Sequence, residues 1–245
     1  STPIKSSAAS DVYKRQRLYM KAVVKMLPGE GNMDYTDIHE QQVTGDLVKI
    51  KIAYSGICGT DIHAMRGTYP STKPPVVLGH EFSGVVVAVG ENVRNIHVGD
   101  RVTSETTYET CGSCHYCHTG DLNLCGARRG VGTNVNGSMA EYVVNHEARI
   151  HVLPENVSLL AAALTEPLAC GVHAVIERGH VHKGDIVCVF GAGAIGQMVA
   201  QVAHACGATV IMAGLSSDVE RLQIATQCGI QRTVDQQAEE LSGVI

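Results

Sequence analysis

The chain has 245 residues, of which 44% are apolar and 18% are charged. This composition excludes an intrinsically disordered chain, and the length suffices for one large domain or two modest ones. The 19 basic residues are outnumbered by 24 acidic ones, and the net charge of −5 offers no basic surface for a nucleic-acid partner.

Membrane and export signals are missing from the sequence. No apolar run approaches the roughly 18 residues that a membrane-spanning helix needs, and the N-terminus lacks the apolar centre of a signal peptide. We therefore expect a cytoplasmic protein without a membrane partner. Its nine cysteines are an odd number, which favours metal ligands and buried thiols over a disulfide framework.

Residues 1–19 differ in character from the rest of the chain. The run from Ser6 to Gln16 resembles the translation of a transposase sequencing adapter, which predicts a non-native leader and a start at Met20. A natural, Ser-rich disordered leader is the alternative. Without its leader the chain would be more acidic, because the leader contains four basic residues and one acidic residue (Lys5, Lys14, Arg15, Arg17 and Asp11).

From Met20 to about Pro154 the sequence predicts a β-rich domain. Short β-type runs are separated by glycines, which is the pattern of strands joined by turns. The expected strands lie at 21–26, 46–54, 82–89, 100–104 and 139–144.

Two glycine-flanked turns of this domain contain reactive side chains. Cys58 lies in the segment 56–63, and His80 and Glu81 follow a glycine. A thiolate, an imidazole and a carboxylate that leave a position for water or substrate make an open zinc site. Taken alone, the cysteine and histidine would more often be ordinary core residues, so the inference depends on the neighbouring motifs.

A cysteine-rich segment follows with the spacing C-x2-C-x2-C-x7-C (Cys111, Cys114, Cys117 and Cys125). Four thiolates gathered by short loops bind tetrahedral Zn²⁺ with no open position, so the site would be structural. An iron–sulfur run would close with three intervening residues and a proline, and disulfides are the other alternative. The remaining cysteines are expected to be buried thiols (Cys170, Cys188, Cys206 and Cys228).

After Pro154 the pattern predicts an alanine-rich helical stretch at 158–178, an apolar strand at 185–190, a glycine turn, a helix to about Cys206 and a strand at 208–213. Strand, glycine turn, helix and strand form the βαβ unit of a doubly wound sheet. The turn is expected to bind the pyrophosphate of NAD or NADP through its glycines and Ile195 (Gly191, Gly193, Ile195 and Gly196).

The choice between NAD and NADP stays open. Gly214 stands where a carboxylate would bind the ribose hydroxyls of NAD, and Ser216 or Arg221 could contact the 2′-phosphate of NADP. Alternatively, Gly214 lies one residue out of register, and Ser216 or Asp218 contacts the ribose. The chain stops near the third strand of a sheet that ordinarily has about six, so we expect a C-terminal truncation of about a hundred residues. A complete minimal domain is the alternative.

These motifs together resemble the zinc-dependent medium-chain alcohol dehydrogenase family, in its sorbitol, iditol, arabitol-phosphate and threonine dehydrogenase branch. The matching segments are 58–63, 79–81, the four-cysteine segment, 166–170 and 191–196. The resemblance implies an α/β plus β fold. A GroES-like zinc-binding catalytic domain would occupy residues 20–165, and a partial Rossmann NAD(P)-binding domain would occupy residues 166–245.

The resemblance also implies the roles of individual residues. Cys58, His80 and Glu81 would bind the catalytic zinc, with Glu166 approaching it directly or through water. Glu81 is expected to be a direct ligand, and a carboxylate that supports the site from behind is the alternative. For Asp61, orientation of His80 and a structural salt bridge are both open.

The implied activity is the NAD(P)-dependent oxidation of a secondary hydroxyl of a polyol or polyol phosphate to a ketose, with two zinc ions per chain. Zinc would acidify the hydroxyl, Thr60 would take its proton, and the cofactor ribose would pass that proton to His63. The alternatives are L-threonine 3-dehydrogenase or another secondary-alcohol dehydrogenase, and a non-catalytic relative. The expected partners are a small polyol and, for the full-length protein, further copies in a dimer or tetramer.

Overall fold

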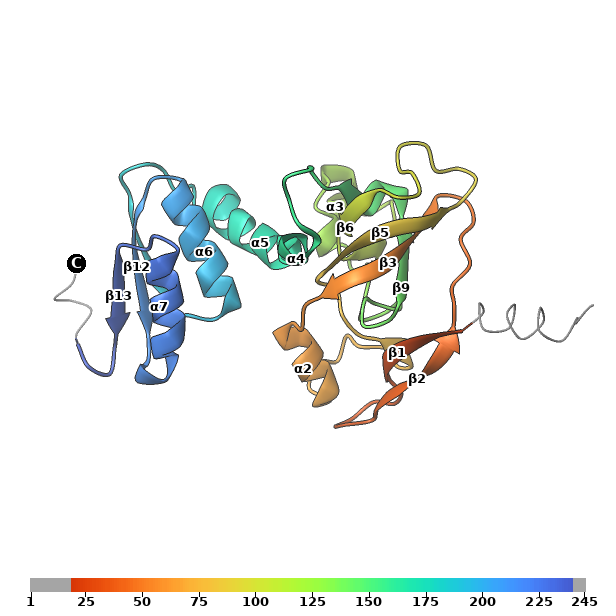
Figure 1. Cartoon of the computed structure of the whole chain (residues 1–245), viewed down its shortest axis with the longest axis horizontal. Helices are drawn as coiled ribbons and strands as arrows, with labels where there is room; N and C mark the ends of the chain where they lie inside the picture. The colour runs from red at the N-terminus through yellow and green to blue at the C-terminus, as the bar shows by residue number, and fades with distance from the viewer. Residues whose placement is uncertain (1–18, 240–245) are drawn as a thin grey trace, which may run out of the picture. The chain divides into compact units, whose positions relative to one another are not determined.

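The computed structural model describes residues 19–239 (Figure 1). Two compact units follow each other along the chain and divide between Glu166 and Pro167. The leader expected at 1–19 lies outside the described residues except for Tyr19, which begins the first strand and pairs with His39. None of the described helices is long and apolar enough to cross a membrane.

The first unit is built mainly from strands, as predicted, and the strands of its sheets pair in antiparallel fashion. The larger sheet has the order β10-β6-β5-β3-β9, and the smaller one has the order β2-β1-β4. Val48, Ile50, Phe82 and Val102 of the larger sheet are at most 1% exposed and form its core. The strands are β1 (Tyr19–Lys25), β2 (Met33–His39), β3 (Leu47–Ser55), β4 (Val76–Val77), β5 (Phe82–Val89), β6 (Arg101–Ser104), β7 (Thr107–Glu109), β8 (Arg129–Gly130), β9 (Tyr142–His146) and β10 (Ile150–Val152).

Short helices lie in the connections between these strands and after the last of them, β10. They are α2 (Gly59–Met65), α3 (His115–Thr119) and α4 (Leu159–Ala162), with 3₁₀ turns at Leu122–Leu124 and Glu147–Arg149. The helical stretch predicted at 158–178 is interrupted after α4. It resumes as α5 (Thr165–Val172), which ends in a π-helical turn at His173–Arg178.

The second unit contains a parallel sheet, which confirms the predicted βαβ unit. Its order is β11 (Ile186–Phe190), β12 (Thr209–Gly214) and β13 (Arg232–Asp235). Helices α6 (Ala194–Ala205) and α7 (Val219–Gln227) pack against β12. The core is made of small and aliphatic side chains (Val189, Ala200, Ala203, Val210, Met212, Leu222 and Ala225).

Several strands differ from the sequence-based expectation, and the short strands β4, β7, β8 and β10 were not predicted. The strand expected at 139–144 begins only at Tyr142, because the backbone of Met139 is already hydrogen-bonded to Leu78 and Val23. Strand β2 was not predicted. It pairs only with β1 and has no buried residue, so its sequence lacks the apolar alternation that marks a half-buried strand.

Candidate functional site

The first group of reactive side chains is assembled from two loops of the β-rich unit. Cys58 immediately precedes α2, whereas His80 and Glu81 lie between β4 and β5. One ligand atom from each of these three residues lies within 4.8 Å of the others. The structure therefore brings together the residues that the sequence suggested as ligands of an open metal site.

Asp61 fastens the two loops to each other. Its carboxylate is only 4% exposed and accepts one hydrogen bond from the backbone N–H of Cys58 (2.9 Å) and one from the N–H of Gly79 (3.0 Å). The same carboxylate lies 3.8 Å from Nδ1 of His80. Asp61 forms no ion pair with a described lysine or arginine; it anchors the backbone of both loops and faces the imidazole.

His80 is 9% exposed, and its Nδ1 makes no hydrogen bond with any described residue. Burial disfavours the imidazolium, but a hydrogen bond with Cys58 and the negative charges of Asp61, Cys58 and Glu166 outweigh it, so the pKa of His80 is raised. A buried imidazole among three acidic groups is an environment that favours a cation. The donor set of Cys58, His80 and Glu81 fits Zn²⁺, which takes sulfur, nitrogen and oxygen ligands.

A glycine that directly follows β3 makes room for the side chain of Glu81. A Cβ atom added to Gly56 would collide with Oε2 of Glu81, and the N–H of Gly56 donates a hydrogen bond of 2.7 Å to the carbonyl of Glu81. The missing side chain at Gly56 therefore makes the space that the carboxylate occupies beside Cys58 and His80.

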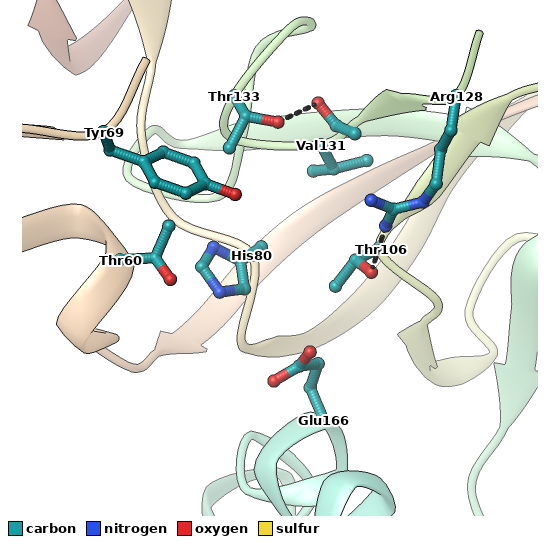
Figure 2. A pocket seen from close by; sticks show the side chains of 9 residues that line it. Thr60, Tyr69, His80, Thr106, Arg128, Val131, Thr133 and Glu166 are labelled. Carbon is teal, nitrogen blue, oxygen red and sulfur yellow. Dashed lines mark hydrogen bonds between the residues drawn. The ribbon is translucent and has the colours of Figure 1, made fainter. Parts of the chain in front are cut away.

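A cavity of about 110 Å³ opens beside His80 within the first unit (Figure 2). Thr60, Tyr69 and Glu166 line it together with residues of the segment after the fourth cysteine, including Arg128 and Thr133. Thr60, His80 and Glu166 were predicted from the sequence, whereas Tyr69, Arg128 and Thr133 were not. These three lie in loops without a recognisable spacing, and only the folded chain brings them to the cavity.

Glu166 enters the cavity from the first turn of α5, and Figure 2 shows its carboxylate pointing toward His80. It does not belong to the group whose ligand atoms lie within 4.8 Å of one another. Burial raises the pKa of Glu166, and the neighbouring charges of His80, Glu81, Arg128 and Asp61 act in opposing directions. This placement leaves room for a water or a substrate group between Glu166 and the other three side chains.

Thr60 and His63 lie on the same short helix but in different surroundings. Thr60 lines the cavity, and its Oγ1 is 3.6 Å from the thiol of Cys58. His63 is exposed, and its Nδ1 lies 3.2 Å from the hydroxyl of Thr68. The structure thus brings Thr60 to the reactive group, whereas His63 faces solvent one helical turn away.

The second cysteine group lies in the loop between β7 and β8. The sulfur atoms of Cys111 and Cys117 are 3.9 Å apart, those of Cys114 and Cys117 are 3.5 Å apart, and those of Cys125 and Cys111 are 3.6 Å apart. Ligands of a tetrahedral ion with bonds of about 2.3 Å are separated by about 3.8 Å. The four thiols therefore fit a closed zinc site, and their separations are far beyond the length of a disulfide bond.

The pKa values of two of these thiols are shifted in opposite directions. Backbone hydrogen bonds from Ser113 and Cys114 lower the pKa of Cys111 to about 6. The pKa of Cys114 is raised to about 11: a backbone hydrogen bond at Cys117 lowers it, but burial and the neighbouring thiols outweigh that effect. Outside this group, Cys170 and Cys228 are exposed, so the expectation of buried thiols was wrong for these two, and Cys188 and Cys206 are only partly buried.

In the second unit, the glycine turn has the geometry expected of a pyrophosphate-binding loop. Gly191 has a φ of 95°, which favours glycine, and a Cβ atom on Gly196 would collide with the carbonyl of Gly191. Gly193 precedes the first residue of α6, and the direction of its missing side chain is open space. The N-terminus of a 12-residue helix is thereby accessible to an anion, with Ile195 exposed in its first turn.

The loop after β12 is arranged differently from the expectation. Gly214 is buried, and a side chain there would press against Leu222 and Asp218 at 3.2–3.3 Å. Arg221 is ion-paired with Asp218 at 3.0 Å, and the hydroxyl of Ser216 donates to Asp235. A side chain at position 214 would therefore point into the unit. This direction favours the alternative that other residues of the loop face the ribose.

Comparison with known proteins places this arrangement in a class. Residues 44–155 match the alcohol dehydrogenase GroES-like domain. A solved structure of a putative zinc-binding dehydrogenase from Sinorhizobium meliloti 1021, bound to NADP, superposes with a TM-score of 0.85 at 35% identity over 93% of this chain and 65% of that one. The fold is therefore that of a zinc-binding dehydrogenase, with a GroES-like and a Rossmann-like part.

Curated relatives narrow the class further. The chain is 48% identical over 226 residues to the D-arabitol-phosphate dehydrogenase of Enterococcus avium, and 47% identical over 226 residues to the sorbitol dehydrogenase of Halalkalibacterium halodurans. It spans 64% and 65% of the length of these two relatives. Residues 44–155 therefore belong to the alcohol dehydrogenase GroES-like domain family, and the chain as a whole is similar to polyol dehydrogenases over the part of their length that it spans.

Proposed function

We propose that this protein oxidises a secondary hydroxyl of a polyol or polyol phosphate to a ketone with NAD or NADP as the oxidant. The observation that carries the proposal is the group of Cys58, His80 and Glu81 beside a cavity lined mainly by polar side chains. Zinc held by the three ligands would acidify a substrate hydroxyl, and a bound nicotinamide cofactor would accept a hydride.

The residues around the cavity would orient the substrate and remove its proton. Thr60, next to Cys58, would accept the hydroxyl proton and release it toward solvent, with exposed His63 as the last acceptor in the chain of transfers. Glu166 would accept a hydrogen bond from a neighbouring hydroxyl of the substrate, which suits a polyol better than a simple alcohol. Its raised pKa would also let it hold a proton at a higher pH than an ordinary glutamate.

We further propose two zinc ions per chain, one in each ligand group. The sulfur separations of 3.5–3.9 Å support the closed site, and the Cys, His and Glu donor set supports the open one. Cofactor binding would use the turn from Gly191 to Gly196 and the loop that contains Ser216 and Arg221. A homo-oligomer in the cytoplasm would be the working form, and light scattering on the purified protein tests its size.

The function is tested by following NADH or NADPH formation with a panel of polyols, polyol phosphates and L-threonine. If the gene continues past Ile245, the longer protein is the one to assay. We expect turnover with at least one polyol or polyol phosphate, and loss of that turnover in Cys58→Ala. Oxidation of threonine alone would support the alternative, and turnover that survives in Cys58→Ala would overturn the proposed site.

A further inference from the structure

A second, larger cavity adjoins the one beside His80. Its volume is about 500 Å³, and it shares Tyr69, Arg128 and Thr133 with the smaller cavity. Both lie within the first unit. These three side chains therefore border both cavities, and an extended ligand that begins beside His80 would have to pass them to reach the larger one.

The charged side chains that line the larger cavity are two cations, Arg128 and Lys73, and no aspartate or glutamate lines it. Cys125, one of the four clustered cysteines, also contributes to the wall. The two cations come from separate loops that are tied together, because the backbone N–H of Lys73 donates a hydrogen bond of 2.8 Å to the carbonyl of Thr133. This wall would repel a cationic ligand and attract an anionic one.

Arg128 is held in place by hydrogen bonds and forms no ion pair with a described carboxylate, although Glu166 lines the smaller cavity with it. Its Nε donates to the hydroxyl of Thr107 (2.8 Å) and its Nη2 to that of Thr106 (2.7 Å), as Figure 2 shows for Thr106. Across residues 19–239, Nη1 makes no hydrogen bond and the guanidinium has no carboxylate within 4.0 Å. The adjacent Arg129 forms an ordinary surface ion pair with Glu109 at 3.1 Å and lines neither cavity.

We propose that Arg128 and Lys73 bind the phosphate monoester of a phosphorylated polyol whose hydroxyl end lies beside His80. This inference deepens the proposed function and rests on it. A guanidinium with one free edge and an exposed ammonium together recognise a dianion, whereas a neutral polyol offers the two cations no negative charge. Three neutral hydroxyl-bearing side chains around the passage, those of Tyr69, Thr106 and Thr133, would hydrogen-bond the hydroxyls in between.

Binding of matched ligands to the zinc-loaded chain tests the inference without requiring turnover. The probes are D-arabitol 1-phosphate, D-arabitol and inorganic phosphate, measured by isothermal titration calorimetry. Wild type is expected to bind the phosphate ester at least about tenfold more tightly than the polyol, because charge-assisted hydrogen bonds are gained. Arg128→Gln should lower the affinity for the ester by about ten- to a hundredfold. Its affinity for the polyol should stay within about twofold of wild type. Lys73→Gln should lower the affinity for the ester several-fold, since a single exposed charge is lost.

Arg129→Gln is the matched control, and it should bind all three probes like wild type. Zinc content and circular dichroism show whether each variant is folded, and Arg128→Lys should recover part of the affinity if charge is what matters. Equal affinity of wild type for ester and polyol, or equal weakening of both by Arg128→Gln, would overturn the anion site while leaving polyol oxidation intact. Binding of inorganic phosphate that depends on Arg128, in a protein that oxidises no polyol, would instead support the anion site and refute the proposed function.

Discussion

The carboxylate of Asp61 lies 3.8 Å from Nδ1 of His80, and the same carboxylate holds the backbone of both loops that carry the open ligand group. One side chain thus ties the two loops together through their backbones and places a negative charge beside the imidazole. We propose that it acts as a positioning residue, since it hydrogen-bonds two ligand-bearing segments and does not line the cavity.

Replacement of Asp61 should therefore weaken the open zinc site selectively. In Asp61→Asn the amide keeps one acceptor oxygen, so one of the two backbone N–H groups loses its partner. We expect zinc affinity at the open site to fall by about 10–100-fold, the range found for groups that orient metal ligands. Competition with a chromogenic chelator measures this, and the four-cysteine site serves as the internal reference. Asp37→Asn, which removes an exposed ion pair with Lys21, should change neither site.

Mutation should remove the two zinc ions independently of each other. Cys114→Ser should remove one zinc and lower the unfolding midpoint by roughly 10 °C or more, because a structural metal contributes directly to folding. Cys58→Ser should remove the other zinc with little change in the midpoint. Metal analysis and thermal unfolding check both statements. A single zinc in the intact protein would contradict the proposal of two sites.

The Gly56→Ala substitution tests whether Glu81 is a direct zinc ligand. The added methyl group would displace the carboxylate, and Gly56 is not one of the glycines with a positive φ, so the substitution adds no backbone strain of that kind. We expect the open site of Gly56→Ala to lose zinc affinity to about the same extent as Glu81→Gln. If Glu81 only supports the site from behind, Gly56→Ala should bind zinc nearly as well as wild type. Chelator competition on the two variants gives the comparison.

Alkylation should distinguish Cys111 from Cys114 in the metal-free chain. With a pKa of about 6, Cys111 is mostly thiolate at pH 7, and it gains a proton as the pH falls through 6. With a pKa of about 11, Cys114 stays protonated at neutral pH. Iodoacetamide at pH 7 should therefore label Cys111 first, more slowly at pH 5, and peptide mass spectrometry reads the sites. Zinc should protect both residues, and preferential labelling of Cys114 would contradict this assignment.

Gly214→Asp should destabilise the second unit rather than change the cofactor. Leu222 and Asp218 already occupy the direction of the new side chain at 3.2–3.3 Å, so overpacking should cost about 1–3 kcal/mol of unfolding free energy. The ratio of NADH to NADPH affinity, measured by fluorescence titration, should change by less than about tenfold. A larger shift toward NADH would mean that the ribose does reach position 214, as the sequence first suggested.

Local spacing accounts for what the sequence predicted well. The four cysteines, the turn from Gly191 to Gly196 and the strand at 82–89 are each specified within a short stretch, and the structure has them as expected. The unpredicted features depend on residues distant in the chain. Asp61 meets the N–H of Gly79 across 18 positions, and Arg128 meets Thr106 across 22. No periodicity or composition marks such contacts before the chain is folded.

The attachment of Arg128 also has a thermodynamic consequence. Its guanidinium is fixed by two threonine hydroxyls, and its backbone N–H donates a hydrogen bond of 3.0 Å to the carbonyl of Cys125. An arginine side chain carries about 2 kcal/mol of rotamer entropy, and here much of it is lost when the protein folds rather than when a ligand arrives. An anion bound there would order few further rotamers, so its affinity would depend on the integrity of the cysteine-rich segment from which Arg128 extends.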